Sequence, residues 1–332
     1  MFETKEKKFK RPFIIAEIGN NHEGSFEIAK KLIFKAKQCG VDAVKFQTFK
    51  PELFVNNTDK KRFKQLTKYQ LTFEEFTKLS KIAKKNKLKF ISTPLDVESA
   101  NHLNKIVDYF KISSGDNNYY ELISEVLSFK KKTIISTGLL NIKELNNLYK
   151  FIKKKSVLKN ISLLHCVASY PADFKNINLA RIKYIERNLK VVPGFSDHTI
   201  GLTASIAAYF FGAQIIEKHF TLDNNFSKFR DHRISLNPND MTKLVNYFKE
   251  LNMIKKTLDT DIYADERLNL PKMRRSYYAN KFIKKGEILD KSKIKFVRPS
   301  LGKSINKLKI ILNKTAKRNI LSGELLTSKI IK

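Results

Sequence analysis

Two histidines stand at the ends of short hydrophobic runs. His198 follows VVPGFSD, and His219 lies near the end of QIIEKHF. A single histidine would more often be structural. A pair at matched positions, with Asp197 and Asp231 close in sequence, can bind a divalent metal ion that acts as a Lewis acid. The spacing predicts a metal site without choosing between manganese, iron and zinc.

Lysine, serine and threonine side chains form a second candidate group, again at the ends of hydrophobic runs. Lysine offers a point charge to a phosphate dianion, and hydroxyl groups add directed hydrogen bonds. The same hydroxyls could instead cap the helices that follow. The candidates for a phosphate site are Lys45, Thr93, Lys111, Ser114, Ser136 and Ser196.

Two carboxylates are candidates for proton transfer or for binding substrate hydroxyls. Glu17 ends the first hydrophobic run, and Asp231 follows the last. Either could instead be a structural partner of Lys45 or Lys218, so spacing leaves both readings open. Cys166 also ends a run, but no general base is evident beside it, and we do not expect a nucleophile.

Nearly all of these residues belong to eight short hydrophobic runs. Amphipathic segments separate the runs; one example is 25–40, with hydrophobic residues at helical spacing and a glycine at its end. Strands alternating with helices indicate parallel βαβ units, and eight units predict an α/β fold, the closed (β/α)8 or TIM barrel. The runs are 13–19, 43–49, 89–94, 109–115, 133–138, 161–166, 191–197 and 214–220.

The polar residues of these runs gather at their C-terminal ends. In such barrels the chemistry takes place at the C-terminal mouth, and the other ends serve stability. One polar strand end would mean little, but eight together predict a ring of active-site residues. The ring comprises Glu17, Lys45, Gln47, Ser92, Thr93, Lys111, Ser113, Ser114, Ser136, Thr137, His165, Ser196, Asp197, His198, Glu217, Lys218 and His219.

The rest of the chain divides into a linker and a second domain. We expect the barrel domain to span 1–258, with a last helix at about 239–257, and a charged linker to span 259–275. Residues 276–332 contain short strands and turns, with the related turns KKGE and LSGE. A β-rich domain of about 57 residues would be marginally stable alone, so we expect it to dock onto the barrel or a partner subunit.

The net charge of +33 raises the question of nucleic-acid binding. Only 11 of the 65 basic residues are arginine, and the lysines are spread along the whole chain. A nucleic-acid-binding protein usually gathers such residues on one face, with aromatic residues among them. A basic nucleic-acid-binding protein without catalysis is therefore a remote alternative.

The compartment is inferred from what the sequence lacks. The longest hydrophobic run, near 202–213, is shorter than the roughly 20 residues that span a bilayer. The N-terminal residues are charged and show no secretory signal, and two cysteines cannot form a disulfide framework. We expect a cytoplasmic protein without membrane contact.

Several motifs, in order from about residue 12 to 330, resemble the bacterial N-acetylneuraminate (sialic acid) synthases, a family that includes the legionaminic and pseudaminic acid synthases. The tail resembles that family's C-terminal antifreeze-like (SAF) domain. The motifs are AEIGNNHEGS (16–25), VKFQTFK (44–50), ISTP (91–94), KISSGD (111–116), ISTGL (135–139), LLHCVASYPA (163–172), GFSDHTIG (194–201), EKHFTLD (217–223), YANKFIKKGE (278–287) and VRPSLG (297–302).

The resemblance implies the reaction and its cofactor. It implies condensation of phosphoenolpyruvate with N-acetylmannosamine, or a related N-acetylated hexose, and water, to give a nonulosonic acid and phosphate. The alternative is a legionaminate or pseudaminate synthase that uses a 2,4-diacetamido-trideoxyhexose. His198 and His219 would bind Mn²⁺, or else Mg²⁺, and the six lysine and hydroxyl residues would hold phosphoenolpyruvate. Glu17 would transfer protons, and Asp116 replaces a catalytic glutamate of many members.

The resemblance also implies a homodimer with swapped SAF domains. Gln47, Tyr170 and Asp231 would contact the sugar. Arg298 would reach into the partner's barrel and meet the acyl group of the sugar. An enzyme acting on a sugar phosphate would need a second phosphate site, and no clear one is visible in the sequence.

Three departures from the family pattern leave the identity of the sugar open. Phe229-Arg230 replaces a common Gly-Pro, Ala168 stands where some members have asparagine, and Ser300-Leu301 alters the usual RPGNG.

Overall fold

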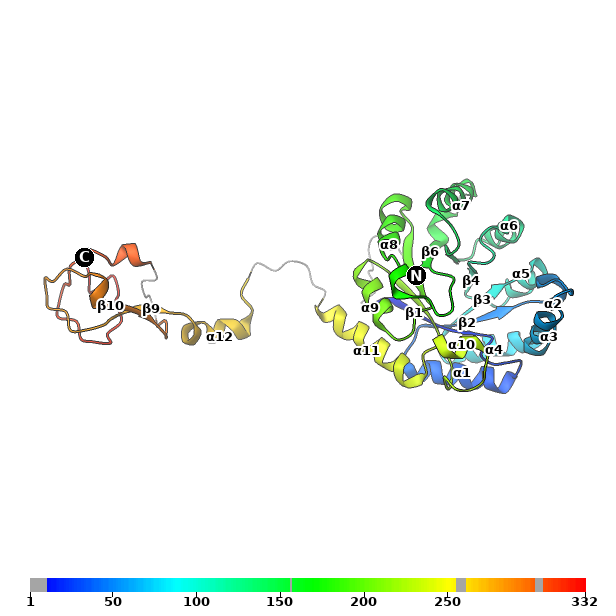
Figure 1. Ribbon diagram of the computed structural model, residues 1–332, viewed down its shortest axis with the longest axis horizontal. Coiled ribbons are helices and arrows are strands. Elements are labelled where there is room, and N and C mark those ends of the chain that lie inside the picture. Colours follow the sequence, from blue (N-terminus) through cyan, green and yellow to red (C-terminus); the bar gives the residue numbers. More distant parts are fainter. Residues whose placement is uncertain (1–10, 156, 255–260, 302–306) are drawn as a thin grey trace. The chain divides into compact units, whose positions relative to one another are not determined.

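The chain folds into two compact units, Met1–Lys255 and Lys256–Lys332 (Figure 1). The computed structural model describes residues 11–155, 157–254, 261–301 and 307–332. Each unit has its own hydrophobic core.

The first unit is a closed barrel of eight parallel strands, paired in sequence order with β8 against β1. The predicted (β/α)8 barrel is therefore confirmed. Every strand lies within a predicted hydrophobic run. The strands are β1 (Phe13–Gly19), β2 (Ala43–Thr48), β3 (Lys89–Pro94), β4 (Tyr109–Ile112), β5 (Thr133–Ser136), β6 (Ile161–Cys166), β7 (Val192–Asp197) and β8 (Ile215–His219).

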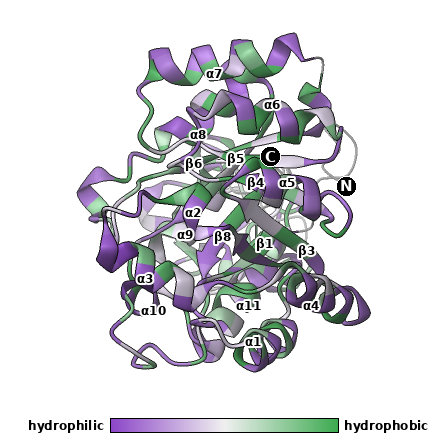
Figure 2. Cartoon of the chain, turned by 90° about the vertical axis from the view of Figure 1, so that its right-hand side faces the viewer, coloured by the Kyte–Doolittle hydropathy of each residue, from purple (hydrophilic) through white to green (hydrophobic). Residues whose placement is uncertain are grey.

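Helices surround the strands and carry hydrophobic as well as hydrophilic residues (Figure 2). The predicted helix 25–40 is α1; Ser25 caps its start by accepting a hydrogen bond from Ile28 N, and Gly40 ends it at φ 81°. The predicted last helix is α11, which ends at Ile254 within the described residues. The helices are α1 (Phe26–Cys39), α2 (Pro51–Phe54), α3 (Lys60–Tyr69), α4 (Phe73–Lys85), α5 (Val97–Leu103), α6 (Tyr120–Ser128), α7 (Ile142–Lys154), α8 (Ala180–Tyr184), α9 (Thr203–Phe210), α10 (Arg230–Ile234) and α11 (Pro238–Ile254).

The inside of the barrel changes from hydrophobic to polar along the strands. A buried cluster containing Ile15, Ala43, Leu164 and Ile215 fills the interior. Side chains two residues apart on a strand share a face, so the next inward layer can be read directly from this cluster. That layer consists of Glu17, Lys45, Thr93, Lys111, Ser136, Cys166 and Glu217.

Gly194 on β7 occupies an inward position that has no room for a side chain. A Cβ atom there would lie 2.3 Å from Leu164 Cδ2 and 2.7 Å from the Ile215 carbonyl oxygen. The glycine lets β6 and β8 fill the barrel beside β7. Ser196 then follows Gly194 on the inward face of β7.

The second unit is small and β-rich, as predicted for a SAF domain. It contains α12 (Ala264–Met273) and the antiparallel strands β9 (Ser276–Ala279) and β10 (Ile294–Val297). The helix α12 lies within the expected linker 259–275. Isolated bridges join the remaining segments around a core that includes Ile283.

The two related turns of this unit have the same construction. Gly286 and Gly323 have φ angles of 82° and 81°, which glycine adopts without strain. Glu287 accepts a hydrogen bond from Lys284 N at 2.8 Å, and Glu324 accepts one from Leu321 N at 3.0 Å. The repeated Gly-Glu pattern therefore encodes one turn used twice.

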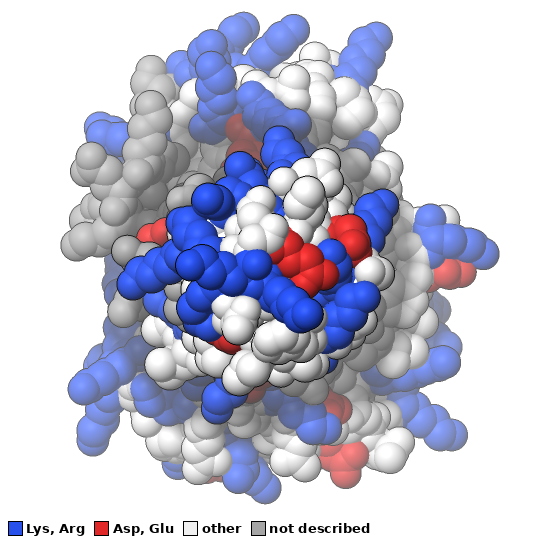
Figure 3. All heavy atoms as spheres, turned by 90° about the vertical axis from the view of Figure 1, so that its left-hand side faces the viewer, with Lys and Arg blue, Asp and Glu red and all other residues white. Residues whose placement is uncertain are grey.

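Lysine and arginine side chains cover much of one face of the second unit, with few acidic side chains among them (Figure 3). Within the described residues, no helix is long and hydrophobic enough to cross a membrane. Nucleic-acid binding without catalysis stays a remote alternative.

Candidate active site

A pocket at the C-terminal ends of the strands brings most of the predicted site residues together. Its position follows from the polar layer of the barrel, which opens above the hydrophobic interior. The predicted residues that line it are Glu17, Lys45, Gln47, Thr93, Lys111, Ser114, Ser136, Tyr170, Ser196, His198, His219 and Asp231.

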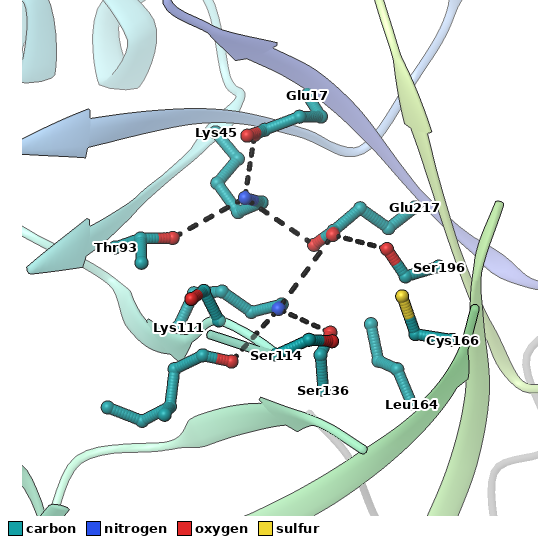
Figure 4. A network of polar contacts seen from close by, with 12 residues as sticks. Glu17, Lys45, Thr93, Lys111, Ser114, Ser136, Leu164, Cys166, Ser196 and Glu217 are labelled. Atoms are coloured by element: carbon teal, nitrogen blue, oxygen red, sulfur yellow. Dashed lines mark hydrogen bonds and ion pairs between the residues drawn. The ribbon is translucent and has the colours of Figure 1, made fainter. Parts of the chain in front are cut away.

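Two lysines and two glutamates form a buried network at the base of this pocket (Figure 4). Lys45 Nζ lies 2.8 Å from Glu17 Oε2 and 3.8 Å from Glu217 Oε2. Lys111 Nζ lies 3.8 Å from the other oxygen of Glu217. The glutamate Glu217 therefore lies between two ammonium groups that come from different strands.

Hydroxyl groups complete the network. Lys45 donates to Thr93 Oγ1 at 3.4 Å, and Lys111 donates to Ser136 Oγ at 2.6 Å. Ser196 donates to Glu217 Oε1 at 2.8 Å, across a pair of neighbouring residues on β7 and β8. Ammonium and hydroxyl donors thus converge at the base of the pocket, the combination that suits a phosphate group.

The two glutamates differ in their acidity. Burial raises the pKa of Glu17 above its ordinary value, although Lys45 opposes this. Burial acts the same way on Glu217, but Lys111, Lys45 and the hydrogen bond from Ser196 outweigh it, so the pKa of Glu217 is lowered. Paired carboxyls with separated pKa values are typical of acid/base sites. The lowered pKa favours the ionised form of Glu217, and the raised pKa favours the protonated form of Glu17 compared with a free carboxyl.

Sequence reasoning placed Glu217 at a strand end but gave it no role. The sequence signal for Glu217 is the alternation of inward and outward side chains along β8. Ile215 belongs to the inner hydrophobic cluster, so Glu217 and His219 share its face. Lys218, between them, points toward the helices.

The two histidines lie together at one side of the pocket. Their ring centroids are 5.4 Å apart, and the ring of Tyr170 lies 4.1 Å from that of His198. Asp231 Oδ2 lies 4.0 Å from His219 Nδ1. The predicted metal and sugar residues are therefore neighbours.

The histidines have the chemistry that a divalent metal ion requires. His198 Nδ1 lies 2.9 Å from the Val167 carbonyl oxygen; because a carbonyl only accepts, Nδ1 carries the hydrogen, and in the neutral ring the lone pair lies on Nε2. Burial opposes protonation of His198, but the neighbouring Cys166 outweighs it and raises the pKa of His198. His219 Nδ1 is buried and has no hydrogen-bond partner among the residues that the structure describes. Burial and neighbouring positive groups hold the pKa of His219 well below its ordinary value, which keeps it neutral as a ligand must be.

The residues present thus fit a metal ion held by two imidazoles. The described part of the chain contains no cluster of three or more histidine, cysteine or acidic side chains arranged as a ligand set. The protein's share of the coordination would be His198 and His219, with Asp231 close by and other positions left open.

Asp197 does not belong to this site, so the expectation that it could serve the metal is wrong. It lies between the strands and the helices, where its Oδ2 is 3.1 Å from Lys218 Nζ, and both side chains are fully buried. Ser205 also donates to it at 2.6 Å. The cause is again alternation, since Ser196 faces inward and Asp197 outward. His165 likewise faces outward and contacts the Ile177 carbonyl oxygen.

Asp116 and Arg298, to which the family resemblance gives roles, also lie outside the residues that line the pocket. Asp116 accepts a hydrogen bond from Ser113, which does line it. Arg298 belongs to the second unit. The catalytic role of Asp116 and the sugar contact of Arg298 stay predictions.

Comparison with known proteins assigns the family. Residues 32–259 match the NeuB family, and residues 274–329 match the SAF domain. The chain belongs to the NeuB family. The resemblance to the sialic acid synthases with a C-terminal SAF domain is therefore confirmed, and with it the expectation of an enzyme.

Relatives match this NeuB chain over nearly its whole length. It is 36% identical to the N,N'-diacetyllegionaminic acid synthase of Campylobacter jejuni, over 96% of this chain and 99% of that protein. It is 31% identical to a pseudaminic acid synthase of Campylobacter jejuni, over 96% of both chains. The crystal structure of an N-acetylneuraminic acid synthetase from Leptospira borgpetersenii, in complex with citrate, has a TM-score of 0.73 at 30% identity, over 78% of this chain and 90% of that chain.

The pocket of this NeuB chain also contains residues that the sequence analysis did not select. Arg62 comes from α3, and Phe229 and Arg230 come from the start of α10. Long connecting segments separate these residues from the preceding strands, so the hydrophobic periodicity of the strands does not identify them. Asn20 lies after β1 and donates to Gln47 at 3.0 Å.

Proposed function

We propose that this chain condenses phosphoenolpyruvate with the open-chain form of an N-acetylated hexosamine and water, giving a nonulosonic acid and phosphate. One observation supports this most strongly: a cradle of two lysines and several hydroxyls lies in the same pocket as a pair of histidines. Phosphate recognition and carbonyl chemistry could therefore act on two substrates held side by side. The names of the full-length relatives support the same reaction class.

The phosphoenolpyruvate site would be the buried network. Lys45 and Lys111 would hold the phosphate as point charges, with the hydroxyls of Thr93, Ser136 and Ser196 as directed donors. Ser114 lines the same wall; it accepts a hydrogen bond from Gly138 N at 3.2 Å and has a side-chain hydrogen bond with Cys166. The lysines would then stabilise phosphate as it leaves.

We assign the metal to His198 and His219, with Mn²⁺ as our choice and Mg²⁺ as the alternative. When bound, the ion would supply Lewis acidity at the aldehyde oxygen of the sugar.

The two glutamates would have different roles at C2 of phosphoenolpyruvate, the carbon to which water adds. C3 of phosphoenolpyruvate forms a bond to C1 of the sugar, and positive charge develops at C2. Ionised Glu217, between Lys45 and Lys111, would stabilise that charge. Water adds to C2, and Glu17 takes one of its protons and passes it to the C1 oxygen, which became an alkoxide when the new C–C bond formed. The bond from C2 to the phosphate oxygen then breaks, and the remaining hydroxyl proton leaves with phosphate, so that C2 becomes a ketone.

For the sugar, we propose a 2,4-diacetamido-trideoxyhexose as the first candidate and N-acetylmannosamine as the second. The support is that the legionaminic and pseudaminic acid synthases of Campylobacter jejuni are 36% and 31% identical over 96% of this chain, whereas the N-acetylneuraminate-9-phosphate synthase of Homo sapiens is 30% identical over 70% of it. Tyr170, Gln47 and Asp231 would contact the sugar at the outer side of the pocket. We further propose a homodimer in which Arg298 of one chain meets the sugar bound by the other.

The test is a substrate panel in which phosphate release is measured with phosphoenolpyruvate, Mn²⁺ and each sugar. We expect turnover with the legionaminic precursor to exceed that with N-acetylmannosamine and the pseudaminic precursor. Lys111→Met should raise the KM for phosphoenolpyruvate by about 10-fold or more, because a charge-assisted hydrogen bond contributes about 1.5–3 kcal/mol. The surface variant Lys143→Ala serves as the control. Salt-sensitive DNA binding without turnover of any sugar would contradict the proposal.

A further inference from the structure

Arg230 is the first residue of α10 and is followed by Asp231. The proposed reaction gives it no role, yet it lines the pocket. Its side chain is 64% exposed, so its position needs a cause other than burial.

Arg230 contacts two of the proposed sugar-binding residues at once. Its guanidinium carbon lies 4.8 Å from the centroid of the Tyr170 ring, and its Nε lies 3.4 Å from Asp231 Oδ1. Among the residues that the structure describes, Asp231 is its only ion-pair partner. A planar guanidinium can stack on an aromatic face and still donate from its edge, which an ammonium group cannot do.

Tyr170 depends on such contacts for its orientation. It lies in the segment between β6 and α8, outside any helix or strand. One neighbour of its ring is the imidazole of His198, and another is Arg230. The arginine therefore links the loop after β6 to the loop after β8.

The backbone that carries Arg230 is anchored on both sides. Before it, the Phe229 ring packs edge-on against Tyr69 of α3, with centroids 5.2 Å apart. After it, the buried His232 lies 2.7 Å from Thr221 Oγ1 and 3.3 Å from Glu23. These contacts hold the backbone on both sides of Arg230, so the guanidinium extends from a fixed position toward Tyr170 and Asp231.

We propose that Arg230 is a positioning residue for the sugar end of the pocket. It fixes the position of the Tyr170 ring relative to the Asp231 carboxylate. It thereby sets the affinity for the sugar without acting on phosphoenolpyruvate. This inference rests on the proposed function.

The kinetic test uses Arg230→Gln and Arg230→Lys, with Arg233→Gln as the matched control. Arg233 lies on the same short helix, is exposed and does not line the pocket. Arg230→Gln should raise the KM for the sugar about 10-fold and leave that for phosphoenolpyruvate within about 2-fold, consistent with loss of a partly exposed cation–π contact and an ion pair. Arg230→Lys should recover only part of the loss. Equal changes in both KM values, or none, would overturn the inference.

A second measurement does not depend on turnover, so it separates failure of this inference from failure of the proposed function. Fluorotyrosine is placed at position 170 of the full chain, and its ¹⁹F resonance is compared among the variants. Arg230→Gln should shift that resonance, and Arg233→Gln should not. An unchanged resonance in Arg230→Gln would overturn the inference even if the wild-type enzyme turned over every sugar.

Discussion

Glu17 on β1 and Lys45 on β2 are directly paired in the barrel, and their charged atoms lie 2.8 Å apart on side chains that are almost completely buried. The same lysine lies 3.8 Å from Glu217 on β8, so one ammonium group faces two carboxylates of different acidity. This arrangement gives the proposed mechanism a carboxylate that can exchange a proton beside one that remains charged.

The first prediction concerns the pH dependence of turnover. Burial raises the pKa of Glu17 from its ordinary value of 4.5. Because the proposed base must be ionised, turnover should fall as the pH drops through the raised pKa, at a pH above 4.5. Glu17→Gln should lower turnover by about 10²–10⁴-fold, the usual contribution of general base catalysis, and remove this acid limb. An acid limb that survives unchanged in Glu17→Gln would contradict the assignment.

The second prediction concerns the metal. His219→Ala should lose Mn²⁺ binding in calorimetric titrations of the metal-free protein, because one of two imidazole ligands is removed. The variant should still fold without metal, since Nδ1 of the wild type makes no hydrogen bond within the described part of the chain. His102→Gln, outside the pocket, is the control and should bind Mn²⁺ as the wild type does. Mn²⁺ binding of wild-type strength in His219→Ala would rule out this ligand.

The third prediction concerns the barrel interior. Gly194→Ala should destabilise the protein by about 1–3 kcal/mol, because the new methyl group would overlap Leu164 and the Ile215 backbone. For a domain of this size the melting temperature should fall by about 2–12 °C. Gly115→Ala is the control, since a Cβ there would meet only Ser113 Oγ at an ordinary 3.6 Å. Equal melting temperatures for the two variants would show that the interior can adjust.

The barrel could be predicted from the sequence because its strands are short hydrophobic runs separated by amphipathic helices. The site could be predicted in outline because chemistry at the C-terminal ends follows from that fold. The outline does not say whether a residue at the end of a strand faces the barrel interior or the surrounding helices. Ile215 and Val192 mark the inward faces of β8 and β7, and counting in twos from them would have selected Glu217 and rejected Asp197.

Residues on the long loops could not be predicted in this way. Arg62 and Arg230 reach the pocket because α3 and α10 pack against the barrel mouth, and no local periodicity encodes that packing. The turns at Gly286 and Gly323 are easier to predict from the sequence, because a glycine followed by glutamate specifies the turn locally.

The fourth prediction concerns the proposed swapped homodimer. Arg298→Ala and His219→Ala should each be inactive alone, but a mixed dimer should recover about half of the wild-type activity. One of its barrels would have its own histidines and an arginine from its partner, and arginine suits that position because it stays charged and offers several donors. The two variants are co-expressed with separate tags, and the heterodimer is purified and assayed for phosphate release. Activity no higher than that of either parent would place Arg298 outside the partner's site.

The most direct test of the central proposal follows the oxygen that bridges C2 and phosphorus in phosphoenolpyruvate. The enzyme is supplied with phosphoenolpyruvate labelled with ¹⁸O at that position, Mn²⁺ and the preferred sugar, and the phosphate and the nonulosonic acid are analysed by mass spectrometry. If water adds to C2 and the bond from C2 to oxygen breaks, the label leaves with phosphate, and the product is unlabelled. Label retained in the product, or no phosphate release with any sugar of the panel, would contradict the proposal.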